Sequence, residues 1–172
     1  MVLWIIGMSG SGKTALGKRV YEELKPGYPN LVFLDGDILR EIMGDDLGHT
    51  IEDRKKNAGR ITRLCKYLDS SGINVIFAVL SLFHESQRWM RENIRDYYEV
   101  YIESDLGVLV QRDSKGIYKK AINGEIKNVV GVDIAFPPPL GPDLTIKNDR
   151  GLDDLYREGG KIIKSIKPLL RR

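Results

Sequence analysis

The stretch Gly7-Met8-Ser9-Gly10-Ser11-Gly12-Lys13-Thr14 directly follows the apolar run from Val2 to Ile6. The run predicts a buried strand, and the stretch matches the phosphate-binding loop (P-loop) pattern G-x-x-x-x-G-K-[ST]. Glycines let backbone N–H groups approach a polyphosphate closely, and the following helix presents its positive end to the anion. The pattern predicts that Lys13 binds the outer phosphates and that the Thr14 hydroxyl binds magnesium. The candidate nucleotide-binding residues of this loop are Gly7, Ser9, Gly10, Ser11, Gly12, Lys13 and Thr14. A Gly/Ser-rich turn is the alternative, which the complete match disfavours.

The composition of the 172-residue chain is that of one globular domain, which we expect to span residues 1–172. A net charge of +3 does not indicate a nucleic-acid polymer as a partner, and it is compatible with a small anionic substrate. The single cysteine, Cys65, excludes an internal disulfide, and its apolar neighbours predict a buried thiol. Residues 2–6 are too few for a signal peptide, and no apolar run is long enough to cross a membrane. The default expectation is therefore the cytoplasm, with no membrane partner.

Short apolar runs alternate with helical patterns along the chain. The runs predict strands at residues 2–6, 31–34, 73–80, 98–102 and 144–147, and the patterns predict helices at 13–25, 38–43, 50–72, 84–93, 106–111 and 152–167. Thr50 fits the capping position of the third helix, and Gly72 fits its end. The almost wholly apolar run at 73–80 is typical of a strand that is buried on both faces. The pattern predicts an α/β, three-layer fold with a mainly parallel five-stranded sheet.

Polar segments follow the predicted strands, where parallel sheets bind their ligands. Besides the P-loop, they are Asp35-Gly36-Asp37 and Ser81-Leu82-Phe83-His84. One carboxylate beside a P-loop can contact magnesium, directly or through water, and the other can accept the proton of an attacking hydroxyl. Asp-Gly-Asp could instead form a simple polar turn.

Two basic regions follow. Arg54 and Asn57 lie three apart on a predicted helix and share a face, so with Arg40 they could bind phosphate or sulfate, although a solvated helix surface remains an alternative. Residues 112–142 lack clean periodicity, contain Lys115 and Lys120, and include a run of three prolines. Such a segment is typical of a functional loop, and we expect a mobile cationic lid within it. A solvated basic helix is the alternative.

Together these segments resemble the adenylylsulfate kinase family, which phosphorylates the ribose 3′-hydroxyl of adenosine 5′-phosphosulfate (APS). The match runs in order from Trp4 to about Asp149. It includes the P-loop, Leu34-Asp35-Gly36-Asp37 with Arg40, Asp46-Leu47-Gly48, and Asp53-Arg54 with Asn57 and Arg60. The most specific part is Arg112-Asp113-Ser114-Lys115-Gly116-Ile117-Tyr118-Lys119-Lys120-Ala121.

The resemblance implies a kinase that uses ATP and Mg²⁺ and acts on a small nucleotide acceptor. It implies catalytic roles for Lys13, Asp35 and Asp37, of which we favour Asp35 as the base, and metal contacts for Thr14 and Asp35. It adds Arg112 to the ATP-binding residues. The implied acceptor-binding residues are Arg40, His49, Arg54, Asn57, Ser81, Lys115, Lys120 and Val129. A homodimer is compatible with this resemblance.

The chain departs from the family pattern on the acceptor side. His49 and Val129 stand where the family usually has two aromatic rings that sandwich the adenine, and His84 stands where it has an arginine. Stacking on one aromatic face is worth roughly 1–3 kcal/mol per base. Cytidine diphosphoramidate, on which similar short relatives act in capsule pathways, is therefore an alternative acceptor to APS.

Two further functions are compatible with a P-loop. The first is a non-catalytic nucleotide-binding regulator, which the acidic pair beside the P-loop disfavours. The second is a nucleoside or shikimate-type kinase, which the segment from Lys115 to Lys120 disfavours.

Overall fold

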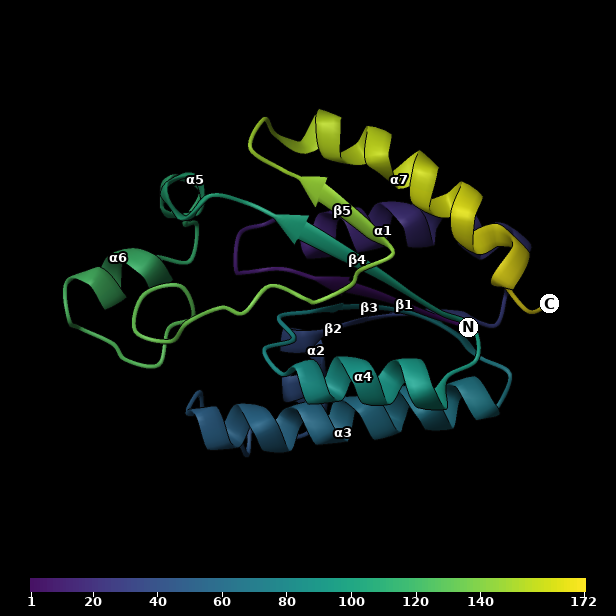
Figure 1. The fold of residues 1–172 in the computed structure, drawn as a ribbon, viewed down its shortest axis with the longest axis horizontal. Helices are drawn as coiled ribbons and strands as arrows, with labels where there is room; N and C mark the ends of the chain where they lie inside the picture. The colour runs from purple at the N-terminus through teal and green to yellow at the C-terminus, as the bar shows by residue number, and fades with distance from the viewer.

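The computed structural model describes residues 1–172 and contains one five-stranded sheet at its centre (Figure 1). The strands are β1 (Val2–Ile6), β2 (Leu31–Asp35), β3 (Asn74–Val79), β4 (Tyr97–Glu103) and β5 (Leu144–Lys147). All neighbouring pairs are parallel, and the order across the sheet is β2-β3-β1-β4-β5. The α/β prediction is confirmed, and the strand that precedes the P-loop is the central one.

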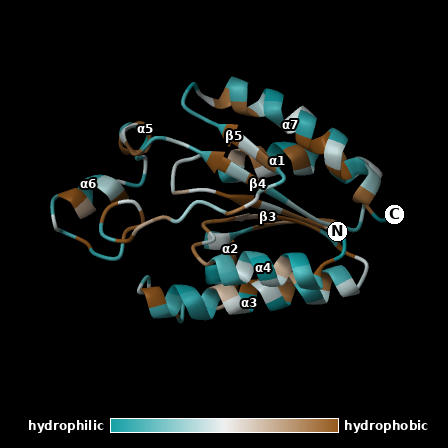
Figure 2. Ribbon diagram, in the orientation of Figure 1, coloured by the Kyte–Doolittle hydropathy of each residue, from teal (hydrophilic) through white to brown (hydrophobic).

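Helices cover both faces of the sheet, which gives three layers (Figure 1). The helices α1 (Lys13–Leu24) and α7 (Leu152–Ile166) lie on one face, and α2 (Gly36–Ile42), α3 (Ile51–Ser70) and α4 (His84–Asn93) lie on the other. The side chains of β1 alternate between two cores, because Leu3 and Ile5 face α1 and α7 whereas Trp4 and Ile6 face α3 and α4. Figure 2 shows the resulting hydrophobic centre and hydrophilic outer helix surfaces.

Side-chain and glycine signals fix the ends of α3. The Thr50 hydroxyl accepts a hydrogen bond from the Asp53 backbone N–H at 3.1 Å, which confirms Thr50 as the cap. Gly72 follows the helix with a φ of +79°, the left-handed conformation that glycine adopts without strain. Cys65 on this helix is fully buried, as predicted, and burial raises the pKa of its thiol.

The segment 112–142 is more ordered than its sequence indicates. After α5 (Leu106–Gln111), it contains the six-residue helix α6 (Ile117–Ile122), which the sequence did not predict. Both helices lie beyond the carboxyl ends of β4 and β5 (Figure 1). The remaining elements are two short 3₁₀ helices, Lys25–Gly27 and Lys167–Leu169.

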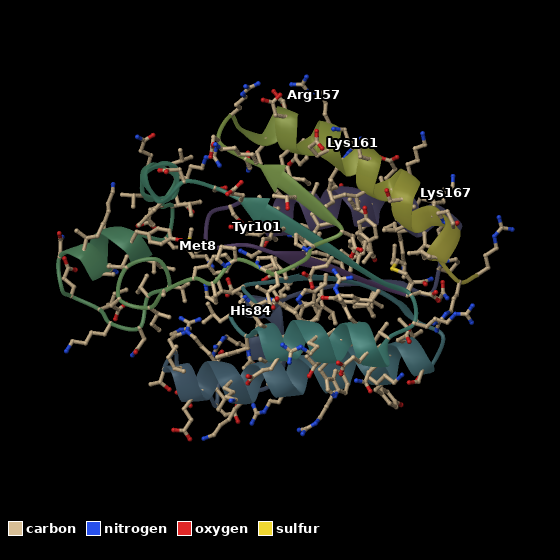
Figure 3. The ribbon with its side chains drawn as sticks, viewed as in Figure 1. Met8, His84, Tyr101, Arg157, Lys161 and Lys167 are labelled. Carbon is tan, nitrogen blue, oxygen red and sulfur yellow. The ribbon has the colours of Figure 1, made fainter.

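The outer surface of α7 is strongly charged. Arg157 and Lys161 on this helix and Lys167 just after it are exposed, and Figure 3 shows their side chains pointing away from the sheet. The opposite face of α7 buries Leu155 and Ile162 against α1. No helix in the structure combines the length and the apolarity that crossing a lipid bilayer requires.

Candidate active site

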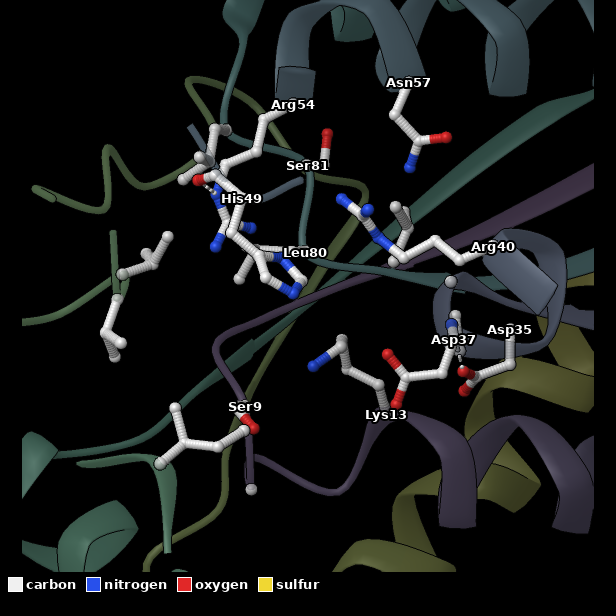
Figure 4. Close-up of a pocket in the computed structure, with 18 of the residues that line it drawn as sticks. Ser9, Lys13, Asp35, Asp37, Arg40, His49, Arg54, Asn57, Leu80 and Ser81 are labelled. Atoms are coloured by element: carbon white, nitrogen blue, oxygen red, sulfur yellow. Dashed lines mark hydrogen bonds between the residues drawn. The ribbon is translucent and has the colours of Figure 1, made fainter. Parts of the chain in front are cut away.

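One cavity of about 640 Å³ opens at the carboxyl ends of β1, β2 and β3. This is the edge of a parallel sheet where ligands bind, and the volume is typical of a small-molecule site. The cavity collects most of the residues proposed from sequence: Ser9, Gly10, Lys13, Thr14, Asp35, Asp37, Arg40, His49, Arg54, Asn57, Ser81, Arg112, Lys115 and Val129. Figure 4 shows that the P-loop and the acidic pair lie on one side of it, and that Arg54, Asn57 and Ser81 lie on the other.

The P-loop curls around the side chain of Lys13. Gly10 and Gly12 have φ values of +76° and +97°, so the loop uses glycine where a left-handed backbone is required. The Lys13 ammonium donates a hydrogen bond to the carbonyl of Met8 at 2.6 Å. Burial lowers the pKa of Lys13 to about 8, against the opposing attraction of the two neighbouring carboxylates. This cation is therefore poorly solvated and gains much from an anionic ligand.

Three P-loop residues shape the loop without lining the cavity: Gly7, Ser11 and Gly12. A Cβ on Gly7 would lie 2.9 Å from the Ile102 carbonyl, and a Cβ on Gly12 would lie 2.5 Å from a Leu155 methyl. The Asn148 amide donates to the Ser11 carbonyl at 2.9 Å and ties the loop to the end of β5. These residues therefore fix the backbone that a phosphate would meet.

The buried cation predicts a pH dependence of ATP binding. Because phosphates favour charged Lys13, its pKa must rise when ATP binds, and the protein takes up a proton wherever the free lysine is neutral. We expect proton uptake near zero for this group below about pH 7 and close to one proton above about pH 9, with ATP affinity falling as pH rises through about 8. Calorimetric titration in buffers of different ionisation enthalpy measures this uptake. Equal proton uptake at about pH 7 and at about pH 9 would contradict the lowered pKa of Lys13.

The two carboxylates occupy different environments. Asp35 is 9% exposed; its Oδ2 accepts from the Thr14 hydroxyl at 2.5 Å, and its Oδ1 accepts from the backbone N–H of Asp37 at 2.9 Å. The side chain of Asp37 is exposed and forms an ion pair with Lys115 of the segment 112–142. The hydrogen bond from Lys115 lowers the pKa of Asp37. Asp35 is therefore a buried, hydrogen-bonded carboxylate beside the P-loop, and Asp37 is an exposed one that is paired with the segment 112–142.

Arginines organise the opposite side of the cavity. Arg40 donates to the carbonyl of Leu47 at 2.7 Å, and Arg54 donates to the carbonyls of His49 and Asn128 at 2.8 and 2.9 Å. Burial lowers the pKa of Arg54. Partial desolvation, followed by the nearby charges of Arg40 and Arg54, lowers the pKa of His49. Both guanidinium groups keep further N–H donors for an anionic ligand.

The lid segment contacts the rest of the site at four points, which we call the lid braces. The Tyr118 hydroxyl donates to the Ser9 carbonyl at 2.9 Å, and Tyr118 itself is 1% exposed. Arg112 donates to the Asn148 carbonyl at 2.9 Å. The other two braces are the Arg54–Asn128 hydrogen bond and the Lys115–Asp37 ion pair. Val129 and Tyr118 pack with Leu109 of α5 in a small apolar cluster, which also attaches the lid segment to α5.

Three further residues that the sequence analysis named lie outside the cavity. Lys120 lies outside the cavity and is exposed, because it is two residues past the inward-facing Tyr118 and so lies on the far side of α6. His84 contacts the Pro138 carbonyl at 2.8 Å and does not line the cavity. Arg60 forms a bidentate ion pair with Asp46.

The cavity also contains residues that the sequence did not single out. Trp4 lies on its wall, 2% exposed, with no hydrogen-bond partner for its indole N–H. Its position three residues before the P-loop, on the α3 side of β1, is the signal that could have found it. Phe83 lines the cavity as well, whereas Trp89 packs against the core on the α3 side of the sheet.

A parallel sheet with a P-loop after its central strand, an acidic pair after the edge strand and a basic segment above them defines a P-loop phosphotransferase. The family model described as adenylylsulphate kinase matches residues 1–147. The chain belongs to this family, and it is an APS-kinase-like phosphotransferase with a small nucleotide substrate.

Individual relatives carry two different activities. The chain is 47% identical, over 86% of its length and 85% of the relative's, to the cytidine diphosphoramidate kinase of Campylobacter jejuni. It is 34% identical, over 98% and 95% of the two lengths, to the adenylyl-sulfate kinase of Gloeothece citriformis. The solved structure of the Mycobacterium tuberculosis APS kinase CysC in complex with AMPPNP and APS superposes with a TM-score of 0.85 at 30% identity and covers 96% of both chains.

Proposed function

We propose that this protein transfers the γ-phosphate of ATP to the ribose 3′-hydroxyl of a nucleotide acceptor. The observation that carries the proposal is that a single cavity joins a P-loop, the Asp35–Asp37 pair and the side chains of Arg40, Arg54 and Asn57. Phosphoryl transfer needs positioning and charge neutralisation, and the two sides of this cavity supply both. The support for ATP as the donor is the family and its complex with an ATP analogue.

Each group that lines the cavity has its own role in this proposal. The P-loop N–H groups and Lys13 bind the phosphates of ATP, with Arg112 beside them. Asp35, held by Thr14 and by the backbone of α2, orients the acceptor hydroxyl and takes its proton. Lys115 leaves Asp37 for the transferred phosphoryl group, and the lid excludes water. Arg40, Arg54 and Asn57 bind the anionic groups of the acceptor.

The Thr14 hydroxyl and the Asp35 carboxylate fit magnesium. They are hard oxygen donors that a hydrogen bond holds next to each other, and magnesium usually takes few protein ligands and keeps several waters. When bound, the ion supplies positive charge to the phosphates of ATP.

APS is the acceptor that the family supplies by default, and cytidine diphosphoramidate is a second candidate. Two observations are compatible with the second candidate. His49 and Val129 line the cavity without providing two large rings for an adenine, and the Campylobacter relative is 47% identical. A smaller pyrimidine ring needs less aromatic surface than a purine does.

The test measures ADP release with ATP and each acceptor. We expect turnover to depend on an acceptor nucleotide, and 3′-phosphorylated product to be found by mass spectrometry. ATP binding with no acceptor-dependent turnover would indicate a regulator instead. APS with much the highest kcat/KM would exclude the pyrimidine nucleotide as the main acceptor.

The His49→Phe variant is the second arm of the same test. A restored aromatic face is expected to raise kcat/KM for APS by about 5- to 160-fold, the equivalent of roughly 1–3 kcal/mol of stacking, without changing the KM for ATP. An unchanged ratio of kcat/KM between APS and cytidine diphosphoramidate would show that position 49 does not face the base. Lys55→Ala, an exposed change near the start of α3, the helix that follows His49, is the matched control.

A further inference from the structure

Ser81 occupies a strained turn just beyond the end of β3. Its φ is +48°, a left-handed conformation that is uncommon for residues other than glycine, and the residue is 8% exposed. Because β3 lies between β2 and β1, this turn sits between the strand that carries Asp35 and the strand that leads into the P-loop. Ser81 also lines the cavity (Figure 4). Strained residues persist where the surrounding structure holds them, and they often mark functional sites.

Gln87 of α4 holds this turn. Its side-chain amide nitrogen donates to the Ser81 carbonyl at 3.2 Å and to the Ser81 hydroxyl oxygen at 3.3 Å. Gln87 is 6% exposed and does not line the cavity. A carbonyl oxygen can only accept, so the nitrogen of the amide, and not its oxygen, must face Ser81.

These contacts determine the direction of the Ser81 hydroxyl. Its oxygen accepts from Gln87, so its proton is free to be donated elsewhere. The structure gives this hydroxyl no acceptor within the protein, and the residue lies on the cavity wall. The proton is therefore available to a ligand in the cavity.

We propose that Gln87 is a positioning residue that fixes Ser81 as a hydrogen-bond donor to the acceptor nucleotide. The site then selects a nucleotide that presents an acceptor atom, such as a carbonyl oxygen or an unprotonated ring nitrogen, at this point. The inference rests on the proposed kinase function and adds a residue that acts on specificity without touching the substrate.

Gln87→Glu is the informative variant, because glutamate has nearly the same shape but only accepts hydrogen bonds. Its carboxylate accepts a hydrogen bond from the Ser81 hydroxyl, so the serine can no longer donate to the ligand and can only accept from it. We expect the KM of the better of the two candidate acceptors to rise at least tenfold, with the KM for ATP changed less than twofold. Gln87→Met, which removes the contacts without adding a charge, is expected to give a smaller rise of the same kind. Arg88→Ala, an exposed change on the same helix, is the control.

The Ser81→Ala background separates positioning from a purely structural role. If Gln87 acts through the serine hydroxyl, Gln87→Glu changes the acceptor KM less than twofold in the Ser81→Ala protein. The same tenfold rise in both backgrounds, or a fall in thermal stability with no change in the acceptor KM, would overturn the inference. A wild-type protein that phosphorylates neither nucleotide would overturn the proposed function, and this inference with it. A wild-type protein that is active, with unaffected Gln87 variants, would overturn this inference alone.

Discussion

Lys13→Ala is expected to lower kcat by a factor of about 10²–10³, because under the proposed function this cation binds the phosphates of ATP. Loss of a single preorganised charge-stabilising donor in a closed site typically costs a factor of about 10²–10³. The rest of the P-loop backbone stays in place, so nucleotide binding should weaken less than turnover. Steady-state ADP release and single-turnover product formation measure the two effects.

The same substitution is not expected to destabilise the fold. The pKa of Lys13 in the folded protein is about 8, below its unfolded value, so the charged side chain opposes folding at neutral pH. That penalty is roughly 3 kcal/mol at most, and it disappears as pH rises from about 8 to above 10. The melting temperature of Lys13→Ala should therefore equal or exceed that of the wild type at neutral pH, with Lys18→Ala on the exposed side of α1 as the control. Wild-type turnover in Lys13→Ala would rule out the assigned site.

Asp35→Asn is expected to lower kcat by a factor of about 10²–10⁴, the usual contribution of a general base. Asparagine keeps an oxygen that can accept the Asp37 backbone N–H, so the start of α2 should survive and the melting temperature should change little. Initial rates over a range of pH measure the loss, together with the thermal unfolding of both proteins.

The Asp37→Asn variant distinguishes the role of Asp37 from that of Asp35. This side chain is exposed and pairs with Lys115, so its loss should act on the lid and cost less than the loss of Asp35. A larger fall in kcat for Asp37→Asn than for Asp35→Asn would assign the proton transfer to Asp37. Asp45→Asn, an exposed change just after α2, is the matched control.

The sheet and the P-loop could be predicted because each has a strong local signal. The run at 73–80 is almost wholly apolar, which indicates a buried strand. The residues 7–14 match every fixed position of the P-loop pattern, whose glycines allow only one kind of loop. Helix α6 carries no such signal, since six residues make less than two turns and show no clear period. Without that helix, the inward direction of Tyr118 and the outward direction of Lys120 could not be predicted.

The acceptor side was predictable in its residues but not in its contacts. The sequence indicated Arg54 and Ser81 as ligand-binding residues. It contains no signal for the hydrogen bond from Arg54 to the carbonyl of Asn128, which lies 74 positions away. It also contains none for the hydrogen bond from Gln87 to the carbonyl of Ser81. Main-chain acceptors are identical in every residue, so no sequence pattern marks them.

Three of the four lid braces end on main-chain carbonyls, those of Ser9, Asn128 and Asn148. Those oxygens remain whatever side chain occupies the position, so mutation at the recipient residues leaves the acceptors in place. Cavity-lining positions such as 49 and 129, which we propose to meet the acceptor base, can then vary while the segment 112–142 keeps its attachment to the rest of the site. A few substitutions among the residues that line the acceptor side of the cavity can therefore change which nucleotide is phosphorylated, while the residues for phosphoryl transfer stay the same.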